Sequence, residues 1–223
     1  NMTKNVFMGY YAGRSITSNK NTVIGYEAGK ENNTSGDLVA FGFEAAHNSQ
    51  NSGRLTAIGY QAGKAHTGGN GNTYLGYQAG HLNGSGDRNV VIGDLTVSGS
   101  SDYNRVTVIG AGAAGGFGSN ANDNTVIGYT AGSSTLTGTN NIIIGSGANL
   151  SGNVSNEITL GNSSVSLFRI PGINLTIGNN GANFAGVVTA TSFSGDGSNL
   201  SNLPASAPVG GASTNTVFFE NDT

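Results

Sequence analysis

The chain has 223 residues, including 38 glycines, 3 prolines, no cysteine and no tryptophan, and its formal net charge is −3. Only 9% of residues are charged and no run of 18 apolar residues occurs, so the composition excludes nucleic acid and membrane insertion from the expected partners. Without cysteine, neither disulfides nor thiolate metal sites can form. The high glycine content predicts closely spaced turns, which are typical of an all-β architecture.

A nine-residue phrase recurs along the chain. NTVIGYEAG at 21–29 returns as LTAIGYQAG from Leu55, NTYLGYQAG from Asn72 and NTVIGYTAG from Asn124. We take its first glycine as the anchor of each repeat, and neighbouring anchors are 16 to 18 residues apart. The anchors are Gly9, Gly25, Gly42, Gly59, Gly76, Gly93, Gly110, Gly128, Gly145, Gly161 and Gly178. This period predicts a parallel β-solenoid (a β-roll) of about eleven coils over residues 5–182.

We call the set of residues at one position of all repeats a column. The two columns directly before the anchor are mainly apolar, which predicts a short strand. The residue directly before the anchor is apolar in every copy, and we assign this column to the core of the repeat. Its members include Ile24, Ile58, Leu75, Ile92, Ile109, Ile127 and Ile144. Because adjacent residues of a strand point to opposite faces, both faces need shielding from water. We expect other copies of the chain to supply the second layer, in a homotrimer.

The residues around the strand predict two kinds of corner. Three positions after the anchor the residue is small in every copy, which indicates tight packing. Four positions before it, asparagine recurs, as at Asn21, Asn72 and Asn124. Asparagine accepts turn conformations and can form hydrogen bonds along a stack of coils, so we expect it where one coil leads to the next.

Few residues suggest chemistry. Glu27 and Glu44 share a column on adjacent repeats, which is compatible with a glycosidase pair but is better interpreted as a polar ladder. An aromatic column, from Tyr10 to Tyr129, suits packing between copies or stacking on a glycan. His47, His66 and His81 lie in or near corners without cysteine partners. We therefore expect no catalytic residue, no metal ligand and no cofactor.

The repeats resemble two related kinds of protein. The apolar strand, glycine and small-residue corner resemble the β-roll in the heads of YadA-type trimeric autotransporter adhesins, which implies a left-handed solenoid. The GYQAG phrase resembles repeats of phage tail fibres. GVVTATSFSGDGSNLSNLP, from Gly186, is similar to C-terminal segments of fibre proteins from phages of cyanobacteria. We expect residues 183–223 to be a cap leading into a further fibre domain, and the chain to be a fragment of a longer polypeptide.

These resemblances imply a structural segment of a phage tail fibre on the virion. It would serve as a spacer and contribute to attachment to the host surface. Expected partners are further copies of the chain, other tail proteins and a host-surface glycan. The alternatives are the head of a bacterial trimeric adhesin on the cell surface and, less favoured, a polysaccharide-degrading tailspike; we expect no enzyme. Receptor contacts are expected in the variable corners, at His66, His81 and Arg105.

Overall fold

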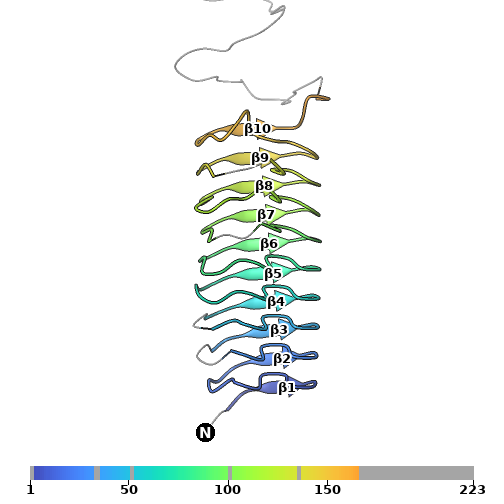
Figure 1. Cartoon of the computed structure of the whole chain (residues 1–223), viewed down its shortest axis with the longest axis vertical. Coiled ribbons are helices and arrows are strands. Elements are labelled where there is room, and N and C mark those ends of the chain that lie inside the picture. Colours follow the sequence, from blue (N-terminus) through green and yellow to red (C-terminus); the bar gives the residue numbers. More distant parts are fainter. Residues whose placement is uncertain (1–2, 33–35, 51–52, 100–101, 135–136, 166–223) are drawn as a thin grey trace, which may run out of the picture. The chain divides into compact units, whose positions relative to one another are not determined.

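The computed structural model describes residues 3–32, 36–50, 53–99, 102–134 and 137–165 (Figure 1). These residues form ten strands of three residues each and no helix, so none of them belongs to a helix that could cross a membrane. The strands are β1 (Val6–Met8), β2 (Thr22–Ile24), β3 (Val39–Phe41), β4 (Thr56–Ile58), β5 (Thr73–Leu75), β6 (Val90–Ile92), β7 (Thr107–Ile109), β8 (Thr125–Ile127), β9 (Ile142–Ile144) and β10 (Ile158–Leu160).

Every strand pairs in parallel with the next strand in the sequence. The strands make one sheet in the order β1 to β10, and equivalent residues of successive repeats lie side by side, as Val23 does with Ala40. This topology confirms an all-β parallel β-solenoid, with about nine turns between the first and last strands. At about 4.8 Å per strand, the described coils stack to about 43 Å. The eleventh coil predicted around Gly178 and the segment predicted over 183–223 lie outside the described residues.

The anchor glycine ends each strand because no other residue fits there. Gly59 has a φ of 134°, in a region that side-chain-bearing residues rarely adopt. A Cβ atom at Gly59 would collide with the carbonyl oxygen of Gly76 on the next coil. The same two restrictions hold at Gly25, Gly42 and Gly110. The recurring glycine therefore sets both the end of the strand and the close stacking of the coils.

From β2 to β9, the middle residue of each strand, two positions before the anchor, points into the interior of the solenoid. The side chains of Val23, Val91 and Ile143 are 0% exposed. The assignment of the next column to the core is therefore wrong for the single chain. In that column Leu75, Ile109 and Ile144 are exposed, and Ile24, Ile58, Ile92 and Ile127 are half-buried. Because successive side chains of a strand point to opposite faces, the residue next to an inward-pointing one must point outward.

Both predicted corners are confirmed. The small residues three positions after the anchor, such as Ala28 and Ala131, are fully buried. The asparagines form a hydrogen-bonded ladder, in which Oδ1 of each accepts the backbone N–H of the equivalent residue on the next coil. Asn124 Oδ1 accepts from Asn141 N at 2.8 Å, while Asn124 Nδ2 donates to the carbonyl oxygen of Gly138 at 2.9 Å. The buried amide of Asn124 is thus paired through both its oxygen and its nitrogen, and the ladder links coil to coil.

Candidate functional site

The main unpartnered feature of the described coils is the outer face of the sheet. It consists of the first and third residues of each strand and the residue after the anchor. Ten strands of three residues make a flat area of roughly 400 Å² before the last column is added. The exposed large apolar side chains of this outer face are Val6, Met8, Tyr10, Tyr26, Val39, Phe41, Phe43, Tyr60, Leu75, Tyr77, Ile109, Tyr129, Ile142, Ile144, Ile158 and Leu160. A soluble monomer rarely exposes a contiguous apolar patch above a few hundred Å², so this face is suited to burial against another surface.

One edge of the outer face is an aromatic ladder. Its five rings are those of Tyr10, Tyr26, Phe43, Tyr60 and Tyr77. Successive ring centroids are 5.0 to 5.4 Å apart, and the ring planes differ by 7° to 17°. Each inner ring therefore has a neighbouring ring stacked on either side, and Tyr26, Phe43 and Tyr60 are 40% to 45% exposed in the single chain. Sugar stacking needs an open ring face, so this geometry favours packing between chains over glycan stacking.

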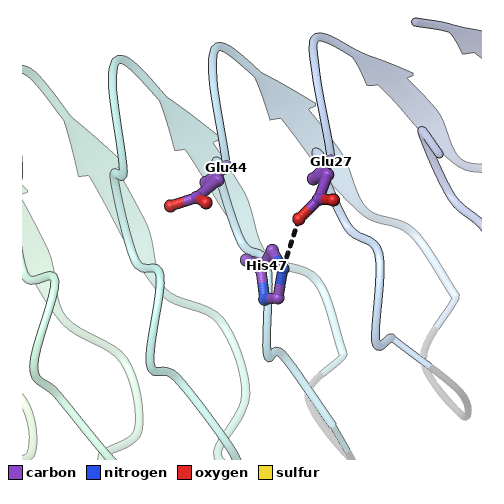
Figure 2. Close-up of side chains that lie close together, drawn as sticks. All are labelled: Glu27, Glu44 and His47. Carbon is purple, nitrogen blue, oxygen red and sulfur yellow. Dashed lines mark hydrogen bonds and ion pairs between the residues drawn. The ribbon is translucent and has the colours of Figure 1, made fainter. Parts of the chain in front are cut away.

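Next to this ladder, Glu27, Glu44 and His47 converge, as Figure 2 shows. Their possible ligand atoms lie within 4.8 Å of one another, close enough to surround a metal ion. Cationic groups already bind both carboxylates, however. Lys30 Nζ lies 3.0 Å from Glu27 Oε2, and Lys64 Nζ is 2.6 Å from Glu44 Oε2. His47 Nε2 contacts Glu27 Oε2 at 3.1 Å. The cluster is thus a network of ion pairs and hydrogen bonds that links three successive coils.

The electrostatics of the two carboxylates do not suit glycoside hydrolysis. The hydrogen bond from Lys30, helped by that from His47, lowers the pKa of Glu27. Desolvation acts to raise the pKa of Glu44, but the hydrogen bonds from Lys64 and Gln61 outweigh it and the pKa is lowered. A glycosidase general acid needs a raised pKa, which neither residue has. Gln61 also bonds Glu44 at 2.8 Å, so the predicted polar ladder is confirmed at this point.

The cations of this network were not predicted from the sequence, although a signal was present. Arg14, Lys30, His47, Lys64 and His81 all lie five positions after their anchors, so basic residues recur on the first five coils. From the second coil on, they follow the column of Glu27, Glu44, Gln61 and Gln78 by three residues, and Lys30 reaches Glu27 on its own coil in this way. A column-by-column comparison of charge would have indicated the pairing.

The three predicted receptor-contact corners differ in exposure. His66 is fully buried, so its assignment as a contact residue is wrong: its ring points into the coil, where Ile16 and Phe117 lie in other repeats. His81 is half-buried, and its Nδ1 lies 3.2 Å from the carbonyl oxygen of Gln78. Arg105 is exposed and holds Asp123 through two bonds of 2.6 and 2.9 Å. Only His81 and Arg105 remain candidates for surface contact.

Comparisons with protein families, curated proteins and solved structures found no match to this chain.

Proposed function

We propose that this chain is a structural segment of a phage tail fibre, in which three copies pack side by side through their outer faces. The observation that carries the proposal is the apolar outer face, which extends from β1 to β10 and which none of the described residues covers. The resemblance of the repeats and of the segment from Gly186 to fibre proteins supports this context.

Packing through the outer face accounts for both apolar columns of the strand. Val91 fills the interior of its own coil, while Ile92 beside it meets the neighbouring copy. Copies arranged around an axis parallel to the solenoid keep equivalent coils at the same height. The aromatic ladders of the copies would then lie at their contacts, where ring edges pack well against aliphatic side chains.

A fibre built in this way acts as a stiff spacer between the virion and the host surface. Specificity belongs to side chains outside the packed columns, in corners that differ from coil to coil. Arg105 and His81 lie in such corners, and loops on a rigid scaffold are the usual place for recognition. A host-surface glycan is the partner that we propose for them.

Antibodies raised against the purified chain test this assignment. They should decorate the tail fibres of purified virions in electron micrographs and reduce adsorption of those virions to host cells. Decoration of a bacterial cell surface would instead support an adhesin head, which would use the same outer face. Absence of label from both would overturn the proposal. Serum raised against an unrelated β-solenoid serves as the control.

A further inference from the structure

The interior of the fourth and fifth coils contains a group of polar side chains. His66, Asn72 and Asn83 are at most 1% exposed; His66 and Asn83 contact the hydroxyl of the fully buried Tyr74, and Asn72 contacts His66. The Tyr74 ring fits because glycine lies above and below it: a Cβ atom at Gly63 or Gly80 would clash with the ring. The proposed fibre function does not involve this group.

The amide of Asn72 has only one orientation that satisfies its neighbours. Its Oδ1 accepts the backbone N–H of Asn89 at 2.9 Å, and its Nδ2 donates to the carbonyl oxygen of Gly86 at 2.8 Å. The same Nδ2 lies 3.1 Å from His66 Nε2. A flipped amide would place its Oδ1 against the carbonyl oxygen of Gly86 and its Nδ2 against the N–H of Asn89, and both contacts would be repulsive. Because Asn72 Nδ2 is a donor, His66 Nε2 must be an acceptor, and the imidazole is neutral.

The proton of the neutral ring is therefore on Nδ1, which faces the Tyr74 hydroxyl oxygen at 3.4 Å. That oxygen also accepts from Asn83 Nδ2 at 2.6 Å. The Tyr74 and Tyr103 phenols are uncharged, since burial raises the pKa of each above its ordinary value. Within the described part of the chain, the side chains that contact the ring nitrogens of His66 are the uncharged Asn72 and Tyr74.

Charges at longer range act in the opposite sense to burial. Burial lowers the pKa of His66, whereas the carbonyl groups of Gly69 and Asn83 and the charges of Asp87 and Asp102 favour the cation. Burial outweighs them, and the pKa of His66 lies below its ordinary value of 6.5. The buried position of the ring and the donor at Asn72 thus both act against protonation.

We propose that His66 makes the middle of the solenoid sensitive to acid. Protonation of Nε2 would place two donors against each other, so the bond to Asn72 is lost and a cation is left inside the coil. An opened coil, in which the ring reaches water, accepts the proton without this cost. Acid therefore favours opening of the fourth and fifth coils over opening of the eighth and ninth, whose interior column has Val126 and Ile143 and whose described residues include no histidine.

The direction follows from linkage. Because the pKa of His66 is lower in the folded chain, the stabilisation is complete above about pH 6.5 and is lost as the pH falls toward the folded value. Within this window the equilibrium constant for opening rises up to about tenfold per pH unit for each chain.

Hydrogen exchange followed by mass spectrometry on the whole chain tests the proposal. After correction for intrinsic rates, amides of residues 66–90 should lose protection between pH 6.5 and 5, while amides of residues 124–134 keep theirs. His66→Asn is the matched variant, because the same column has Asn32 and Asn83 on other coils. It should remove the acid effect, and His81→Asn should preserve it. Equal loss of protection in both segments, or an acid effect that survives His66→Asn, would overturn the proposal.

A second measurement does not depend on the variant folding. In nuclear magnetic resonance spectra of the native chain, the His66 ring should stay neutral below pH 6.5, where a free imidazole is mostly protonated. Titration of His66 at or above its ordinary value, with the fold intact, would show that the interior tolerates the charge and would contradict the proposal.

Discussion

Strand β9 offers two neighbouring isoleucines that separate interior packing from contact between chains. Ile143 is 0% exposed and points into the coil, whereas Ile144 is 39% exposed on the outer face. The substitutions Ile143→Ala and Ile144→Ala remove the same atoms from adjacent positions of one strand. Any difference between their effects therefore reports on the environment of the side chain.

The expected magnitudes differ. Truncation of a fully buried isoleucine costs about 2–5 kcal/mol of unfolding free energy, so Ile143→Ala should destabilise the chain by this amount in any state of assembly. Ile144 is already partly in water in the single chain, so its truncation should cost only about 1 kcal/mol there. If neighbouring copies bury Ile144, its cost in the assembled state should approach that of Ile143.

Urea unfolding at several protein concentrations, followed by circular dichroism, measures both effects. Ile143→Ala should lower the midpoint by a similar amount at every concentration. The loss caused by Ile144→Ala should grow as the concentration rises and the parent protein assembles. A greater loss from Ile144→Ala than from Ile143→Ala in the dissociated chain would show that the strand is turned the other way. A loss from Ile144→Ala that stays small at all concentrations would refute burial of the outer face.

Three further predictions concern the repeat itself. Gly110→Ala should abolish the circular dichroism signal of the soluble fold, because its Cβ would collide with the next coil. Gly152→Ala should melt like the parent, because apart from its chain neighbours no described residue lies within 4 Å of the added Cβ. Asn124→Ala should lower the free energy of unfolding in urea by about 1–3 kcal/mol, because the N–H of Asn141 loses its acceptor. Asn124→Leu should lower it less, because the larger side chain fills the space that alanine leaves. Equal losses for the two variants would count against this reasoning. Because the pKa of Glu44 is lowered, its carboxylate stabilises the fold above about pH 4.5, and this contribution disappears in more acidic solution. The melting temperature of Glu44→Gln should therefore fall less than that of the parent between pH 5 and 3. An equal fall in both proteins would argue against the ion pair.

The period and strand positions could be predicted from the sequence because both depend on one residue that has no substitute. A glycine such as Gly59 is required where the backbone has positive φ and the next coil lies against it. The asparagine ladder was predictable for a similar reason, since Asn124 is a buried polar residue that needs partners on adjacent coils. The strand positions and the ladder were predicted from where glycine and asparagine recur within the repeat, and not from the overall composition.

The direction of the strand could not be predicted, because two adjacent columns are both apolar. Hydrophobicity alone does not distinguish an inward from an outward side chain when both are apolar. Side-chain size was the available signal. The inward column includes residues as different in size as Ala57 and Tyr74, because the space inside the solenoid varies from coil to coil. The outward column has a large residue in every repeat, such as Ile58 and Leu75.

The burial of His66 was missed because histidine in a glycine-rich corner is usually exposed. Its column is apolar at Ile16 and Phe117 but polar at Asn32 and Asn83, so comparison of the repeats did not indicate that the ring lies inside. The repeat period alone does not specify how far a side chain reaches across a corner, so the pairing of Glu27 with Lys30 was indicated only by the recurrence of basic residues five positions after the anchor.

The mass of the purified chain in solution, measured by light scattering after size-exclusion chromatography, tests the central claim most directly. Burial of the outer face predicts three times the 22.4 kDa of one chain, and Ile92→Asp, which puts a charge on that face, should reduce the mass to that of one chain. A parent chain that is monomeric and folded at micromolar concentration, with the outer face open to water, would contradict the account.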